Sequence, residues 1–168
     1  MDKDFEINIE KSCCFTGHRP EKIRNSEAKV REALRKEILK AIEAGCDTFI
    51  TGMAPGVDYW AGFEVMDLMA SGHNIHLVCA VPFPGVQRKR DQVQKEEFER
   101  IIDAADKVEY ICPGYRAWCF SARNRWMVDN SSYVIAVFNG TVGGTEYTMK
   151  YAKNKGCKMV VIDDSKEL

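Results

Sequence analysis

The chain has 168 residues, a formal net charge of −1 and a hydrophobic content of 45%. This length and apolar content fit one folded domain with a full core, and the balanced charge excludes a globally basic protein that wraps nucleic acid. The longest apolar runs, 133–138 and 159–162, are too short to span a bilayer, and the charged first residues lack the apolar core of a secretory signal. Seven cysteines without framework spacing indicate reduced thiols, so we expect a cytoplasmic protein.

Short runs of β-forming residues alternate along the chain with stretches of helical periodicity. The expected strands are 12–15, 48–50, 76–81, 108–111, 133–138 and 158–162, and the expected helices are 26–44, 57–71, 87–105, 116–129 and 145–155. In the first helical stretch, apolar residues recur every four positions from Val30 to Ile42, and Gly45 follows as a stop signal. Such alternation is typical of βαβ units, which build a mostly parallel sheet. We therefore predict a single doubly wound, Rossmann-like α/β domain over residues 1–168, with helices flanking the sheet.

Four loops, 17–20, 51–61, 82–90 and 139–148, each follow a predicted strand. Because ligands of open α/β sheets bind beyond the carboxyl ends of the strands, these loops are expected to form one site. In the first loop, Gly17 allows a ligand to approach the backbone, and Arg19 can give forked hydrogen bonds to a phosphate. His18 either contacts the same ligand or serves as a hydrogen-bonded turn histidine.

The segment NGTVGGTEYT contains a glycine turn that indicates an anion-binding site. Its candidate ligand-binding residues are Asn139, Gly140, Gly143, Gly144, Thr145 and Glu146. A helix expected to begin near Thr145 would offer unpaired N–H groups and a favourable dipole to an anion. Alternatively, the glycines only make a tight turn and Thr145 is an ordinary N-cap.

The segment TGMAPGVDYWA forms a second glycine turn, with candidate ligand-binding residues Thr51, Gly52, Gly56 and Asp58. Two such turns at one edge suit a ligand that lies across two helix N-termini, although Asp58 could simply cap its helix. Arg123 is a further candidate from the helix at 116–129. The alternative there is a solvated helix face with an ion pair between Arg125 and Asp129.

These motifs carry a resemblance to a known superfamily. TGMAPGVDYWA resembles the glycine-rich strand-to-helix segment of the DprA and LOG proteins, and GGTEYTMKYA is similar to the second signature of that superfamily. With CCFTGHRP added, residues 12–162 resemble the YpsA-like branch of the SLOG superfamily. The resemblance implies a Rossmann-like fold whose strand edge binds nucleotides or nucleotide-derived ligands.

One position departs from the LOG pattern. LOG phosphoribohydrolases, which cut the N-glycosidic bond of nucleoside monophosphates, carry Pro-Gly-Gly-x-Gly-Thr-x-x-Glu. When Gly144 and Thr145 are aligned with that motif, Thr148 stands in place of the glutamate, and Glu146 lies two residues too early. Glu146 is therefore a catalytic candidate only if the protein is a hydrolase of rearranged geometry.

The sequence favours a cytosolic sensor or adaptor that binds a nucleoside phosphate or an ADP-ribose-like ligand. Two alternatives stay open: a LOG-type nucleoside 5'-monophosphate phosphoribohydrolase, and a DprA-type binder of single-stranded nucleic acid, the less favoured partner given the balanced charge. No cofactor, metal or membrane contact is expected, since Cys112, Cys119, His73 and His76 do not make a four-ligand set. A homo-oligomer is compatible with the sequence, which leaves open whether any reaction occurs.

Overall fold

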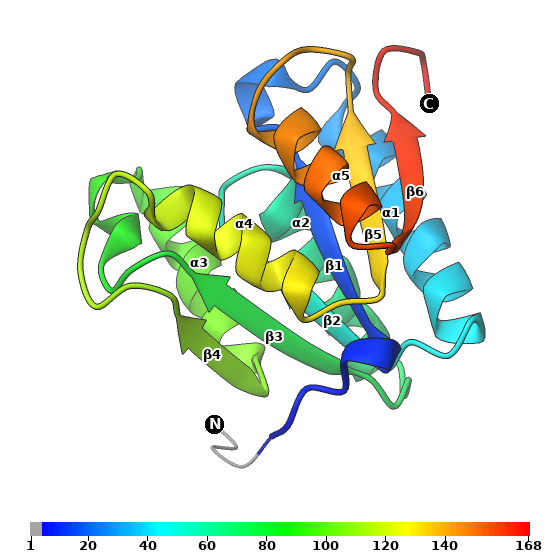
Figure 1. Ribbon diagram of the computed structural model, residues 1–168, viewed down its shortest axis with the longest axis horizontal. Coiled ribbons are helices and arrows are strands. Elements are labelled where there is room, and N and C mark those ends of the chain that lie inside the picture. The colour runs from blue at the N-terminus through cyan, green and yellow to red at the C-terminus, as the bar shows by residue number, and fades with distance from the viewer. Residues whose placement is uncertain (1–4) are drawn as a thin grey trace.

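The computed structural model describes residues 5–168, which form a single α/β domain around a six-stranded sheet (Figure 1). Every pairing between neighbouring strands is parallel, and the strand order is β4-β3-β2-β1-β5-β6. The strands are β1 (Ser12–Gly17), β2 (Thr48–Thr51), β3 (His76–Val81), β4 (Lys107–Tyr110), β5 (Tyr133–Phe138) and β6 (Lys158–Asp163). The doubly wound, Rossmann-like arrangement predicted from the sequence is confirmed.

Helices cover both faces of the sheet, which explains why β1, β2 and β5 consist almost entirely of buried residues. The helices are α1 (Glu27–Glu43), α2 (Val57–Ala70), α3 (Gln92–Ala104), α4 (Cys119–Asp129) and α5 (Gly144–Asn154). The first three cover one face, and α4 and α5 lie together on the other (Figure 1). One cluster of core side chains lies under each of these layers.

Two helices begin later than the periodicity predicted. The segment Val86–Lys89 forms a separate 3-10 turn, and Asp91 then caps α3 by accepting a hydrogen bond from the N–H of Gln94 at 2.8 Å. The expected start at residue 87 was therefore wrong by five positions, because a side-chain cap fixes where the helix begins. Helix α4 likewise begins at Cys119 rather than at residue 116.

The sheet has its topological switch point between β1 and β5. From β1 the chain runs outward through β2, β3 and β4, and then returns to pair β5 with the other side of β1. The segments after β1 and β5 consequently diverge to opposite faces, and a crevice opens between them. This crevice is where a ligand of an open α/β sheet is expected.

Within residues 5–168, no helix is long and apolar enough to cross a membrane. The same residues contain no group of three or more His, Cys, Asp or Glu side chains arranged to hold a metal ion.

Candidate functional site

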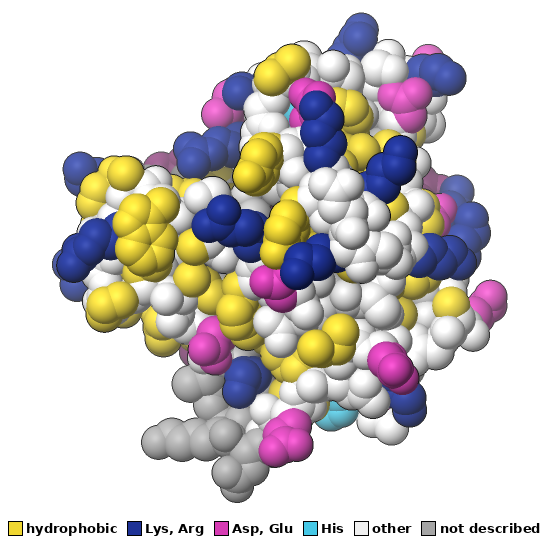
Figure 2. All heavy atoms as spheres, viewed as in Figure 1, with side chains coloured by type: hydrophobic (Ala, Val, Ile, Leu, Met, Phe, Trp, Pro, Cys, Tyr) yellow, Lys and Arg dark blue, Asp and Glu magenta, His cyan; other side chains and the backbone are white. Residues whose placement is uncertain are grey.

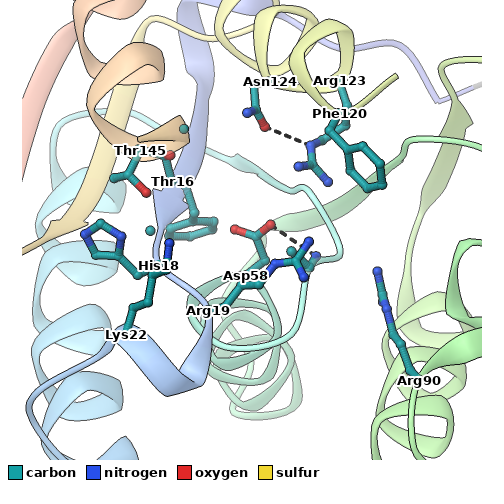
Figure 3. Close-up of a pocket in the computed structure, with 14 residues that line it drawn as sticks. Thr16, His18, Arg19, Lys22, Asp58, Arg90, Phe120, Arg123, Asn124 and Thr145 are labelled. Atoms are coloured by element: carbon teal, nitrogen blue, oxygen red, sulfur yellow. Dashed lines mark hydrogen bonds between the residues drawn. The ribbon is translucent and has the colours of Figure 1, made fainter. Parts of the chain in front are cut away.

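A cavity of about 240 Å³ lies at the switch point, beyond the carboxyl end of β1. Figure 3 shows side chains from β1, the loop after it, α2, α4 and the start of α5 converging on this space. Its lining residues are Phe15, Thr16, Gly17, His18, Arg19, Lys22, Ala54, Asp58, Arg90, Phe120, Arg123, Asn124, Gly144 and Thr145. The volume is slightly below the range of roughly 300 to 1,000 Å³ typical of small-molecule sites, which suits a compact ligand.

The sequence predicted half of this lining. Of the fourteen candidate residues, the cavity brings together Gly17, His18, Arg19, Asp58, Arg123, Gly144 and Thr145. The other seven, Thr51, Gly52, Gly56, Asn139, Gly140, Gly143 and Glu146, lie outside the lining. Whether any of these seven residues contacts a ligand stays a prediction. Most of them have a structural role in the turns and loops around the cavity.

Two glycines fit the loop after β1 tightly against the start of α2. A Cβ on Gly17 would lie 2.5 Å from the Val57 side chain. Gly56 adopts a φ of +96°, and a Cβ there would lie 2.8 Å from the carbonyl oxygen of His18. Gly17 therefore serves packing as well as cavity access. Gly56 is required by its backbone conformation and by the close approach of the neighbouring loop.

The turn after β2 contacts Asp58 and fixes its position. The hydroxyl of Thr51 donates a 2.7 Å hydrogen bond to the carbonyl of Asp58. Gly52 leaves room for two side chains at once, since a Cβ there would lie 2.8 Å from the Asp58 Oδ2 atom and 3.0 Å from the Arg123 side chain. Thr51 and Gly52 thus hold the polar groups of the cavity without facing it.

Asp58 occupies the first turn of α2 and is only 8% exposed. Its Oδ2 atom accepts a 3.2 Å hydrogen bond from the backbone N–H of Ala54. Burial raises the pKa of this carboxyl, while the nearby Arg123, the Ala54 hydrogen bond and Arg90 all act to lower it. Asp58 does not cap α2, since Gly56 is the N-cap and no side chain provides a capping bond; the helix-capping alternative was wrong, and Oδ2 instead stabilises the turn before the helix.

Arg123 projects from α4 into the cavity and is 7% exposed (Figure 3). Its Nη1 atom donates to the carbonyl of Gly52, and its Nε atom donates to the Asn124 side chain at 2.8 Å. Burial lowers the pKa of the guanidinium, and the charge of Asp58 opposes that shift. Arg123 therefore lines the cavity, as does its neighbour Asn124; contact of Arg123 with a ligand stays a prediction.

The expected ion pair between Arg125 and Asp129 does not form. Asp129 instead lies 3.4 Å from the Lys155 ammonium and accepts a 2.7 Å hydrogen bond from the Tyr151 hydroxyl. The sequence spacing suggested a pair within one helix, but α5 supplies nearer partners because it packs beside α4.

The N-terminus of α5 opens toward the cavity. Gly143 is the N-cap and provides no side-chain capping bond, so the interpretation of Thr145 as the N-cap was wrong. The first-turn N–H groups have no partner within the helix, and a Cβ on Gly144 would meet nothing within 4 Å. Thr145 lies in the first turn and lines the cavity (Figure 3).

His18 connects the two loops that flank the crevice. Its Nε2 atom accepts a 3.2 Å hydrogen bond from the backbone N–H of Asn139, and its ring stacks on Phe138 at a centroid distance of 5.8 Å. Burial lowers the pKa of this imidazole; Asp164 raises it, and Lys22 lowers it further. His18 therefore lines the cavity and also performs the structural role that the sequence left as its alternative.

Asn139 organises the loop after β5 from outside the cavity. Its side-chain amide donates to the Lys22 carbonyl at 2.9 Å, and its Oδ1 atom accepts hydrogen bonds from the N–H and hydroxyl of Thr141. Gly140 follows with a φ of +91°, which turns this loop back toward α5.

Glu146 lies on α5 but turns away from the cavity. Its carboxylate pairs with the Lys150 ammonium at 2.9 Å, one helical turn further on. Thr148, at the position of the LOG glutamate, donates its hydroxyl to the Gly144 carbonyl at 2.8 Å. Neither side chain lines the cavity.

Two cations of the cavity, Lys22 and Arg90, were absent from the predicted set. Lys22 ends the 3-10 turn Pro20–Lys22 just after the GHRP loop. Arg90 donates to the Met53 carbonyl at 2.8 Å and to the Tyr59 hydroxyl at 2.6 Å, which holds it beside the cavity. Arg90 lies in the loop 82–90, one of the four loops expected at the site, so the sequence could have indicated it as a site residue. Lys22 had no comparable signal.

An open groove continues from the cavity between α4 and α5. It shares Phe120, Asn124 and Gly144 with the cavity and is further lined by Ala117, Ser121, Arg125, Gly143 and Tyr147. Figure 2 shows hydrophobic side chains gathered over α4 and the segment before it, with Lys and Arg side chains around them. Gly143 thus contributes to the edge of the site rather than to the cavity itself.

Comparisons with known proteins agree with this architecture. A family model described as the YspA SLOG family matches residues 13–164. The uncharacterized SPbeta prophage-derived protein YoqJ of Bacillus subtilis is 31% identical over 117 residues, which cover 62% of this chain and 68% of that protein. A UPF0398 protein of Brevibacillus brevis is 23% identical over 129 residues, or 75% of this chain and 69% of that protein.

Two solved structures share the fold. DNA processing protein A from Helicobacter pylori, described for its single-stranded DNA binding mode, superposes with a TM-score of 0.65 at 15% identity, covering 94% of this chain and 70% of that chain. DprA from Streptococcus pneumoniae gives a TM-score of 0.53 at 16% identity, covering 90% of this chain and 58% of that chain. At these identities the likeness concerns the fold alone. Because the family model spans nearly the whole sequence, the chain belongs to the YspA SLOG family.

Proposed function

We propose that this chain is a cytosolic sensor or adaptor that binds a nucleotide or a nucleotide-derived ligand in the cavity at the switch point. The observation that carries the proposal is the charge of the lining. Arg19, Lys22, Arg90 and Arg123 surround a single carboxylate, Asp58, although the chain as a whole has a net charge of −1. Such a local excess of cations favours an anionic ligand.

The start of α5 supports a phosphate at one end of this ligand. Gly144 and Thr145 bring uncapped first-turn N–H groups to the cavity, where the helix dipole favours negative charge. The Arg19 side chain is exposed and makes no hydrogen bond to residues 5–168, so its guanidinium is available for forked hydrogen bonds to the phosphate. Membership of the SLOG family adds support for a nucleotide-type ligand.

The hydrolase alternative finds no support in the position of Glu146. A glycosidase needs a carboxylate that can reach the reacting centre, and Glu146 is paired with Lys150 outside the lining. With Glu146 outside the lining, the acid of a rearranged LOG geometry is not in place, and we expect binding without turnover of the LOG type. The DprA-type alternative has only the shared fold in its favour.

The test is calorimetric titration of the purified protein with AMP, ADP-ribose and a single-stranded oligonucleotide, combined with chromatography for released adenine. Saturable binding of AMP or ADP-ribose without release of adenine would support the proposal. Adenine release on the order of 1 per second or faster would replace it with the hydrolase alternative. If only the oligonucleotide binds, with an affinity that falls steeply with salt, the nucleic-acid alternative is correct.

A further inference from the structure

We propose that Asp58 recognises the vicinal hydroxyls of a ribose, so that the cavity selects ribonucleotides over deoxyribonucleotides. This inference rests on the proposed nucleotide-binding function and specifies the sugar that the site accepts. The phosphate-binding groups of the cavity do not distinguish the two sugars. Asp58 is the one group in the described lining that accepts hydrogen bonds through a full negative charge.

The first observation is that half of the Asp58 carboxylate has no protein partner. The side chain is more than nine-tenths buried, and Oδ2 is held by the N–H of Ala54 at 3.2 Å. Oδ1 makes no hydrogen bond to any of residues 5–168, and the side chain faces the cavity (Figure 3). Oδ1 is not one of the fully buried unpaired atoms of the described residues, so it is open to the cavity and free to accept a hydrogen bond from a ligand.

The second observation is that Arg123, although near Asp58, forms no ion pair with it. Arg123 is fixed by its bonds to the Gly52 carbonyl and the Asn124 side chain. Neither a hydrogen bond nor an ion pair joins Arg123 to Asp58 within residues 5–168, although the two side chains approach the same space from α4 and α2 (Figure 3). An ion pair between them would have removed the free acceptor. Its absence leaves Oδ1 available to a ligand.

The chemistry of a nucleotide then limits what Asp58 can bind. A phosphate at neutral pH offers oxygen acceptors, which a carboxylate would repel. The hydroxyls of a ribose are neutral donors, and two adjacent O–H groups match the acceptor geometry of a carboxylate. Thr145 and Asp58 lie on different walls of the cavity (Figure 3), so a phosphate near α5 leaves the sugar to face Asp58.

The experiment compares sugars in the wild-type protein by calorimetric titration. The probes are AMP, 2'-deoxy-AMP, 3'-deoxy-AMP and the base-free pair ribose 5-phosphate and 2-deoxyribose 5-phosphate. We expect each deoxy compound to bind at least about tenfold more weakly than its ribose counterpart, the effect of losing a hydrogen bond to a charged group. Because ribose 5-phosphate and 2-deoxyribose 5-phosphate have no base, a difference between them cannot come from a hydrogen bond between a base amino group and Asp58.

Asp58→Asn keeps an acceptor for the N–H of Ala54 but replaces the charged oxygen that faces the cavity. In this variant we expect the preference for ribose to fall to within about threefold. Asp129→Asn, the same change at a carboxylate that pairs with Lys155 away from the cavity, should keep the full preference. Thermal melting of both variants establishes that they are folded.

The possible failures are distinguishable. If wild-type protein binds the ribose and deoxyribose probes equally, the inference about Asp58 is wrong and the proposed function stands. If it binds none of the probes, both are wrong. A ribose preference that persists in folded Asp58→Asn would assign the recognition to another residue and overturn the inference. If Asp58→Asn does not fold, the wild-type comparison with both deoxy forms still decides the sugar preference.

Discussion

His18 and Asn139 are joined by a hydrogen bond although 121 residues separate them in the sequence. The Asn139 N–H donates to His18 Nε2 at 3.2 Å, which links the loop after β1 to the loop after β5 across the crevice. The bond requires an unprotonated Nε2 atom, because the imidazolium has no acceptor. This link between the two loops therefore depends on the protonation state of His18.

The first prediction concerns the pH dependence of stability. Burial lowers the pKa of His18 from its ordinary value of 6.5, so the unfolded chain takes up a proton at a higher pH than the folded protein does. The free energy of unfolding should therefore fall as the pH falls through about 6.5 toward the lower folded value. In His18→Gln, which can still accept a hydrogen bond, this loss should be smaller by roughly 0.5 kcal/mol between pH 7 and 5, a modest value because the ring lines an open cavity rather than the core of the protein.

Urea unfolding at a series of pH values measures this difference. His73→Gln is the matched control, since the His73 side chain is exposed and lies far from β1 in the sequence. Equal slopes for His18→Gln and wild type would show that His18 does not couple folding to protonation.

The second prediction separates ligand binding from folding at Arg19. This side chain lines the cavity but is exposed and unbonded within residues 5–168. Arg19→Ala should weaken binding of AMP by about 1.5–3 kcal/mol, the usual range for hydrogen bonds to charged groups, and change the melting temperature little. Calorimetric titration and thermal melting measure the two effects. Lys36→Ala, an exposed cation on α1, should change neither. Unchanged affinity with a large drop in melting temperature would assign Arg19 to the turn alone.

The third prediction is that Asp58 lowers the stability of the ligand-free protein. Because burial raises its pKa, the charged form is less favourable in the folded protein than in the unfolded chain at neutral pH. Asp58→Asn should therefore raise the free energy of unfolding at pH 7 by on the order of 1 kcal/mol, the usual scale for such changes. The gain should shrink as the pH falls toward 3.8, the ordinary carboxyl value, since both states then bind the proton. A gain that is constant between pH 7 and 4 would contradict this cause.

The fourth prediction contrasts two glycines that line the same cavity. A Cβ on Gly17 would lie within 2.6 Å of three atoms of the Val57 side chain, whereas one on Gly144 would meet nothing within 4 Å. Gly17→Ala should lower the free energy of unfolding by about 1–3 kcal/mol through overpacking. Gly144→Ala should leave stability nearly unchanged and weaken AMP binding, because the added methyl group stands where a phosphate would approach the α5 N–H groups. Urea unfolding and titration of the two variants decide between these roles, and a stable Gly17→Ala would show that Val57 can move aside.

Much of the fold could be predicted from local patterns. The strands at 76–81 and 133–138 were predicted with their observed bounds, because short β-forming runs between helical periods have few other solutions. The predicted start of a helix was less accurate where a 3-10 turn comes before it, as at α3. The residues of the turn and those of the helix have similar composition, so the sequence pattern does not show where the capping residue lies.

The sequence by itself determined that four loops meet at one edge of a parallel sheet, because parallel strands carry their carboxyl ends on the same side. Only the tertiary structure decided which residues of those loops face the cavity. Glu146 does not face the cavity because it pairs with Lys150 on α5. Gly52 does not face it either, because it packs against the side chains of Asp58 and Arg123. Arg90 reaches the cavity through bonds to Met53 and Tyr59, which lie more than thirty positions earlier in the chain. Side-chain direction depends on such distant partners, and no local pattern specifies them.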